Sequence, residues 1–82
     1  MSYFLLVYDR RQQRLLSERV FAEHRQALRS RFSEERRRSG EADVEVVVIG
    51  AGSREDLQRT HARYFRSPRD LAGDLAGSVS ER

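Results

Sequence analysis

Tyr3-Phe4-Leu5-Leu6-Val7-Tyr8 is a continuous apolar run of aromatic and branched side chains. Its length and composition are typical of a strand that is buried on both faces. Polar residues 9–13 follow this run, and the half-apolar stretch 14–21 predicts a second strand. Because the connection is short, the two strands are expected to form an antiparallel hairpin, with the first strand at the centre of the sheet.

The pattern changes to a helical one after the hairpin. Residues 22–38 contain no Gly or Pro and are rich in helix-forming residues. Leu28 and Phe32 lie four residues apart on this helix, and Phe21 falls on the same line just upstream of it. We therefore expect a thin apolar stripe that covers a sheet rather than a central core helix.

A third strand and a second helix are predicted next. Residues 43–49, Asp-Val-Glu-Val-Val-Val-Ile, are the strongest strand in the chain, and only Glu45 interrupts their apolar character. Ser53 followed by Asp56 is a variant capping box, which predicts a helix that starts there and runs to about Phe65.

The sequence thus predicts a single small α/β (α+β) domain over residues 1–66, with the order β-β-α-β-α. A right-handed crossover through the first helix is expected to bring the third strand parallel to one strand of the hairpin. The expected sheet is three-stranded and mixed, in the order 2-1-3, with two helices. A tandem Asp-Leu-Ala-Gly repeat and a Ser-rich end predict a flexible C-terminal tail over residues 67–82.

Length and composition exclude several classes of protein. The chain has 82 residues, which is the size of one domain. It has no cysteine, and this excludes a disulfide scaffold, a thiolate zinc site and a Cys nucleophile. No apolar run approaches the roughly 20 residues of a membrane span, and the N-terminus has no signal-peptide pattern. We expect a cytoplasmic protein with no membrane partner.

The charge is unevenly distributed. The chain has 16 basic and 13 acidic residues, for a net charge of +3, and every basic residue is Arg. Residues 1–40 hold ten Arg and five acids (+5), whereas residues 41–82 hold six Arg and eight acids (−2). Part of the Arg excess is also what the codon usage of a GC-rich gene produces. This asymmetry still suggests a nucleic-acid-binding face on the first helix, and the candidate residues are Arg25, Arg29, Arg36, Arg37 and Arg38.

A second candidate surface depends on where the helices pack. If both helices cover the same side of the sheet, the other side exposes apolar side chains, and a monomer rarely tolerates such a patch. The candidate interaction face comprises Phe4, Leu6, Val47 and Ile49. The first functional hypothesis is therefore a non-enzymatic protein-interaction module, an adaptor or regulatory subunit that forms a homodimer or binds another protein. The alternative is a nucleic-acid-binding or ribosome-associated protein that uses the Arg-rich first helix.

Enzyme chemistry has weak support in the sequence. Gly50-Ala51-Gly52 resembles half of a dinucleotide-binding fingerprint, but Glu55 occupies the third Gly position and would repel phosphate. His61 is expected to be a core histidine. Asp9 and Glu45 leave a metal-dependent nuclease open as a third hypothesis. We predict no catalytic residue, cofactor, metal or small-molecule substrate.

Four segments carry a resemblance to other proteins. They are Phe-Leu-Leu-Val-Tyr-Asp-Arg, Ala-Leu-Arg-Ser-Arg-Phe, Val-Glu-Val-Val-Val-Ile-Gly-Ala and Thr-His-Ala-Arg-Tyr-Phe. Over about residues 3–65 the chain resembles a group of small uncharacterised proteins of high-GC bacteria. The resemblance implies no activity, and no site residue rests on it.

Overall fold

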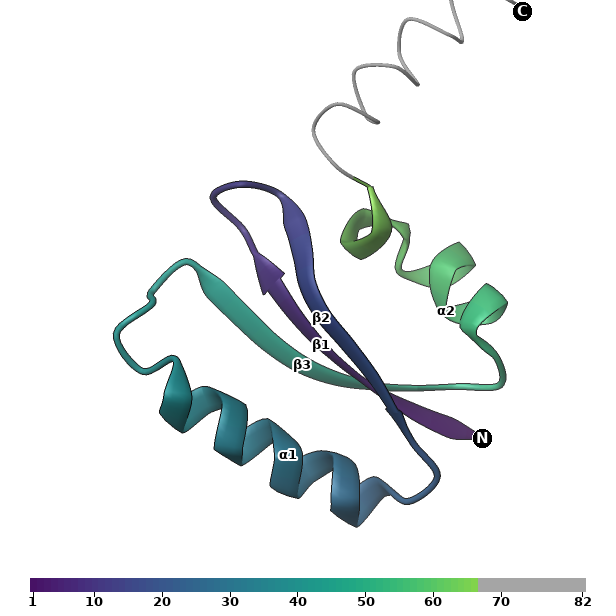
Figure 1. The fold of residues 1–82 in the computed structure, drawn as a ribbon. Coiled ribbons are helices and arrows are strands. Elements are labelled where there is room, and N and C mark those ends of the chain that lie inside the picture. Colours follow the sequence, from purple (N-terminus) through teal and green to yellow (C-terminus); the bar gives the residue numbers. More distant parts are fainter. Residues whose placement is uncertain (67–82) are drawn as a thin grey trace, which may run out of the picture.

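The computed structural model describes residues 1–66 of the chain. Its elements are, in order, β1 (Ser2–Asp9), β2 (Arg14–Phe21), α1 (His24–Arg37), β3 (Val44–Ala51), α2 (Arg54–Thr60) and the 3₁₀ helix η1 (Ala62–Phe65) (Figure 1). The predicted order β-β-α-β-α is confirmed. The predicted tail, residues 67–82, lies outside the described residues.

The three strands form one sheet in the predicted order, with β1 between β2 and β3. The prediction of a mixed sheet is wrong, because β1 pairs antiparallel with both neighbours. Leu6, for example, lies opposite Glu18 of β2 and Val47 of β3. The connection through α1 does make β3 parallel to β2. However, β1 separates these two strands, so no parallel pair forms.

The helices pack on opposite sides of the sheet (Figure 1). Alternate side chains of β1 therefore support two different layers. On the side of α2 and η1, one buried cluster comprises Phe4, Leu6, Tyr8, Leu57 and Tyr64. Leu5 and Val7 point to the side of α1 and are at most 1% exposed.

This arrangement removes the open apolar face that the interaction hypothesis requires. Phe4 and Leu6 are 5% and 0% exposed, and Val47 and Ile49 are partly buried against the same cluster. All four candidate residues belong to the core beneath α2 and η1. A charge at Val47 is therefore expected to destabilise the fold rather than to report on a dimer contact.

The predicted inner stripe of α1 is also wrong. Phe32 is 59% exposed, and the two buried residues of the helix are Ala27 and Glu34. Ala27 allows the helix to approach the sheet closely, and the buried Glu34 is paired with Arg37 and Arg38. The helix is therefore rotated away from the orientation that Leu28 and Phe32 predicted.

The second predicted helix is interrupted at His61. α2 ends at Thr60 and η1 begins at Ala62, because His61 leaves the helical region with φ −129° and ψ 47°. The start of α2 is as predicted, since the Ser53 hydroxyl accepts a hydrogen bond from the Asp56 amide at 3.1 Å. No helix among residues 1–66 is long and apolar enough to cross a membrane.

Candidate nucleic-acid interface

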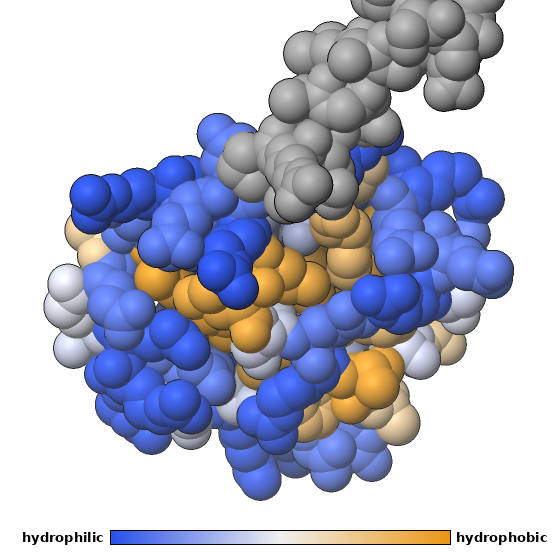
Figure 2. All heavy atoms as spheres, turned by 45° about the horizontal axis from the view of Figure 1, so that its top comes forward, coloured by the Kyte–Doolittle hydropathy of each residue, from blue (hydrophilic) through white to orange (hydrophobic). Residues whose placement is uncertain are grey.

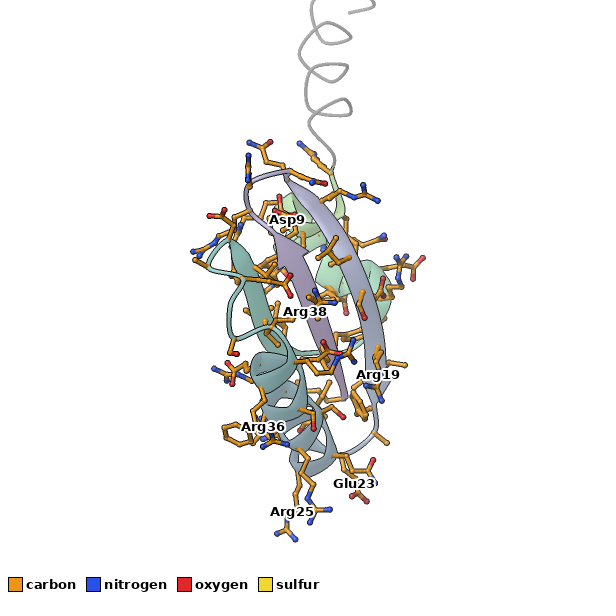
Figure 3. All side chains as sticks on the ribbon, turned by 60° about the vertical axis from the view of Figure 1, so that its left-hand side comes forward. Asp9, Arg19, Glu23, Arg25, Arg36 and Arg38 are labelled. Carbon is orange, nitrogen blue, oxygen red and sulfur yellow. The ribbon has the colours of Figure 1, made fainter. Side chains whose placement is uncertain are left out.

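Two of the five candidate arginines are structural. Arg37 and Arg38 bind the buried carboxylate of Glu34 at 3.3 and 3.1 Å, and Arg38 also reaches Glu41 at 3.3 Å. The side chain of Arg38 is only 21% exposed and is turned toward the sheet (Figure 3). These two residues pair with Glu34 at the C-terminal end of α1. The guanidinium group of Arg38 is therefore poorly accessible to a ligand.

The other three candidates, Arg25, Arg29 and Arg36, form an exposed row on α1. Among residues 1–66, none of the three has an ion-pair, hydrogen-bond or aromatic partner. Arg25 and Arg36 both point into solvent (Figure 3). The shared face that their spacing predicted is therefore present, and its guanidinium groups are available.

Phe32 lies within this row. It is seven residues after Arg25, three after Arg29 and four before Arg36, so all four side chains share one side of the helix. We call Arg25, Arg29, Phe32 and Arg36 the α1 surface. At a rise of about 1.5 Å per residue, the α1 surface extends for roughly 16 Å.

The acids of the same helix do not neutralise the α1 surface. Glu34 is buried and pairs with Arg37 and Arg38, and Glu35 pairs with Arg31 at 3.3 Å. Glu23 precedes the helix, and its side chain points in a different direction from that of Arg25 (Figure 3). Within residues 1–66, the α1 surface therefore carries three positive charges without an ion-pair partner and one exposed aromatic ring.

A polar network of different character joins β3 to η1. Both carboxylate oxygens of Glu45 accept from Nη2 of Arg63 at 3.1 Å, and Oε2 also accepts from the Tyr64 hydroxyl at 2.6 Å. Nη2 of Arg63 further donates to the Tyr64 oxygen at 2.9 Å. Burial raises the pKa of Tyr64, and its hydrogen bond to Glu45 raises it further.

The same network lowers the pKa of Glu45. Burial acts in the opposite direction, but the hydrogen bonds from Tyr64 and Arg63 and the positive charges of Arg63 and Arg10 outweigh it. The carboxylate is therefore ionised in the folded protein at neutral pH. It fixes η1 to the sheet.

We predict that Glu45→Gln lowers the free energy of unfolding by about 1.5 kcal/mol at neutral pH, because charge-assisted hydrogen bonds are lost. The folded pKa of Glu45 lies below its ordinary value of 4.5. Its stabilisation is therefore complete above that value and is lost as the pH falls through the folded pKa. Urea unfolding of both proteins at about pH 7 and pH 3 should show the difference shrinking. A constant difference would contradict this role.

The remaining candidate sites do not assemble. Glu45 shares the face of Tyr8, its partner across the ladder, whereas Asp9 is the next residue of β1 and alternates to the other face. Asp9 instead accepts from the Arg11 and Gln12 amides at 2.9 and 3.0 Å and so shapes the hairpin turn. Within residues 1–66, no group of three or more metal-ligating side chains is present. The structure therefore does not support the metal-nuclease hypothesis.

His61 and the glycine turn have structural surroundings. The His61 ring is half-buried, lies 2.9 Å from the Thr60 hydroxyl and stacks on Tyr64 at 6.4 Å between centroids. A side chain at Gly52 would come within 3.1 Å of the Asp56 carboxylate. An acid therefore already occupies the place where a dinucleotide phosphate would bind.

Sequence reasoning missed one residue of the α1 surface and one further site. Phe32 was assigned to the core because it lies one turn from Leu28, and only the burial of Ala27 and Glu34 shows otherwise. The further site is a cleft of about 490 Å³ lined by Tyr8, Arg10, Gln13, Arg63 and Arg66. Its residues come from two distant segments, so no local pattern indicates it.

Comparison of the chain with protein-family models, curated proteins and solved structures finds no match.

Proposed function

We propose that the protein binds single-stranded nucleic acid through the α1 surface. The observation that carries this proposal is the exposed ring of Phe32 within a row of three unpaired arginines. Phosphate groups would pair with Arg25, Arg29 and Arg36, and an unstacked base would lie on Phe32. This function is the alternative that the charge distribution suggested, now with an aromatic contact added.

The two parts of the α1 surface supply different kinds of affinity. Arg contacts to phosphate release counterions and are independent of sequence. An aromatic ring stacks on any base, but only where the base is not already paired and stacked in a duplex. Over roughly 16 Å the surface is long enough to contact several successive phosphates of an extended strand. Together these features favour a single strand over a duplex.

The first test replaces Arg25, Arg29 and Arg36 together by Gln. We expect affinity for a labelled single-stranded oligonucleotide to fall about 100-fold near 0.1 M salt, and the salt slope to decrease by about 2. Fluorescence anisotropy over a salt series measures both. The matched control replaces Arg11, Arg14 and Arg59, which are also exposed, and so removes the same charge elsewhere. Equal losses in the two triple variants would show that net charge alone drives binding and would contradict the proposal.

In the same assay, Phe32→Ala tests the base contact. Loss of one stacked base is expected to weaken single-strand binding by about 1–2 kcal/mol and to leave duplex binding nearly unchanged. Phe32→Leu keeps an apolar side chain and should lose as much, because it has no ring. Since Phe32 is 59% exposed, neither variant should change the melting temperature appreciably. An equal effect on single strand and duplex would exclude stacking.

Self-association is a second candidate function, and one observation favours it. β3 is an edge strand, and its sequence Val-Glu-Val-Val-Val-Ile-Gly-Ala is almost wholly apolar. Such an edge offers unpaired backbone groups to a strand of another copy. If the edges join, light scattering on nuclease-treated protein should give twice the 9.6 kDa of one chain, independent of salt. A monomer mass at every concentration would contradict this route to a homodimer.

A further inference from the structure

The cleft between the β1–β2 turn and η1 is a second cationic site, separate from the α1 surface. It lies on the side of the sheet that α2 and η1 cover, whereas α1 lies on the other side (Figure 1). Tyr8 forms its apolar part, and Arg10, Gln13, Arg63 and Arg66 line the rest. Figure 2 shows the top of the molecule, where hydrophilic side chains, shown in blue, surround a patch of hydrophobic atoms.

Arg63 is held rigidly in this cleft. Its guanidinium carbon lies 4.2 Å from the centroid of the Tyr64 ring and 5.5 Å from that of Tyr8. The two tyrosine rings meet edge to face at 5.1 Å, which fixes the platform beneath it. Of the three guanidinium nitrogens of Arg63, Nη2 alone has hydrogen-bond partners within residues 1–66. These partners are Glu45 and Tyr64. The N–H groups on Nε and Nη1 remain available for a ligand.

Arg10 is prepared in a similar way from the opposite wall. Its Nη2 donates to the Ala42 carbonyl at 2.8 Å, and its backbone amide donates to the Asp43 carbonyl at 2.8 Å. In the part of the chain that the structure describes, its other guanidinium nitrogens have no partner. One anchored amino group thus orients the remaining donors of the planar guanidinium, whose fork can bind two oxygens of a carboxylate or a phosphate at once.

Gln13 adds an amide to the same cleft at a cost in backbone conformation. It is the one non-glycine residue among residues 1–66 with a positive φ, at 56°. Residues other than Gly, Asn and Asp seldom adopt this left-handed region. The backbone conformation of this turn alone would therefore favour glycine over glutamine at this position.

The charge and size of the cleft define its ligand. Three guanidinium groups, those of Arg10, Arg63 and Arg66, line the cleft, and the carboxylate of Glu45 is already bound by Arg63 and Tyr64. A phosphate monoester carries a charge of about −1.5 to −2 at neutral pH. The volume of about 490 Å³ exceeds the needs of a bare phosphate and falls in the range of small-molecule sites.

We propose that this cleft binds the phosphoryl group of a small phosphate monoester of the size of a sugar phosphate or a mononucleotide. Arg10 and Arg63 donate to the phosphoryl oxygens, and the ester group extends along Tyr8 and Gln13. This site goes beyond the proposed function of the α1 surface and does not depend on it.

Calorimetric titration of the full chain tests the proposal with four probes: inorganic phosphate, ribose 5-phosphate, adenosine 5′-monophosphate and adenosine. We expect both esters to bind more tightly than inorganic phosphate, and adenosine not to bind. If adenosine 5′-monophosphate binds more tightly than ribose 5-phosphate, the base also lies in the cleft and the ligand is a mononucleotide. If the two affinities are equal, the ligand is a sugar phosphate. Adenosine binding as tightly as its monophosphate, or inorganic phosphate as tightly as both esters, would overturn the proposal.

Variants locate the binding in the cleft. Arg10→Gln should weaken ester binding at least about tenfold, because a charge-assisted contact is lost. Arg11→Gln removes the same charge from the neighbouring residue, which does not line the cleft, and should change affinity less than twofold. The triple Gln variant of the α1 surface should bind the esters like the parent protein. Equal effects of Arg10→Gln and Arg11→Gln, with thermal melting confirming that both variants fold, would overturn the assignment.

Discussion

Leu57→Ala is expected to lower the free energy of unfolding by about 3 kcal/mol. Leu57 is fully buried and is the one buried residue of α2, so it holds that short helix to the sheet. Its side chain packs in the cluster with Phe4 and Leu6, and neither neighbour can close the space without moving the central strand. Urea unfolding followed by circular dichroism measures the change.

Leu57→Met is the matched control for this cavity. Methionine nearly conserves the volume, so its cost should stay under about 1.5 kcal/mol. If Leu57→Ala costs no more than Leu57→Met, α2 does not depend on this contact. In that case η1 alone would have to cover the side of the sheet on which Phe4, Leu6 and Tyr8 lie.

Glu34→Ala is expected to cost about 3 kcal/mol as well, for an electrostatic reason. Glu34 is only 6% exposed, and its carboxylate is shared by Arg37 and Arg38. Removing it leaves the Arg38 guanidinium, at 21% exposure, with Glu41 as its one remaining acidic partner among residues 1–66. A partly buried cation with too few acidic partners lowers the free energy of unfolding. The C-terminal end of α1 should therefore pack less firmly on the sheet.

Glu35→Ala provides the comparison one position along the helix. Glu35 pairs with Arg31, but both side chains are more than 40% exposed. Exposed pairs of this kind contribute about 0.2–1 kcal/mol. Urea unfolding at low salt should therefore separate the two variants by at least about 2 kcal/mol. Similar costs for both would mean that burial of Glu34 adds nothing to its pairing.

Much of the fold could be predicted because it rests on local patterns. The run from Tyr3 to Tyr8 identified the central strand, and the pair Ser53 and Asp56 marked the start of α2. The direction of β3 was missed although its place was right. A crossover from β2 makes β3 parallel to β2, and a position beside β1 then makes that pair antiparallel, so order and connection together determine the ladder.

The orientation of α1 could not be predicted from its hydrophobic residues. Leu28 and Phe32 indicated one face, but the helix turns Ala27 and Glu34 inward. A small side chain permits close approach, and a glutamate can be buried when two arginines follow it at the correct spacing. Hydrophobic periodicity ignores both effects, so Phe32 was assigned to the core and its exposure was unexpected.

Of the two candidate sites, one could be predicted from local spacing and the other could not. The shared face of Arg25, Arg29 and Arg36 follows from helical spacing alone and was predicted correctly. The cleft depends on Arg10 and Arg63 lining the same space, although they are 53 positions apart in the chain. Only the tertiary fold brings such pairs together, and the sequence offers no periodicity that indicates it.

The central position of β1 has a consequence for the order in which the chain folds during synthesis. The strand that needs two neighbours and two covering layers emerges first, but only β2 follows it immediately. Leu5, Leu6 and Val7 must wait for α1, β3 and α2 before both faces are covered. In a nascent chain that ends before residue 44, the apolar edge of β1 that later pairs with β3 is still unpaired. Chaperones recognise exposed edges of this kind, and chains that expose them tend to aggregate.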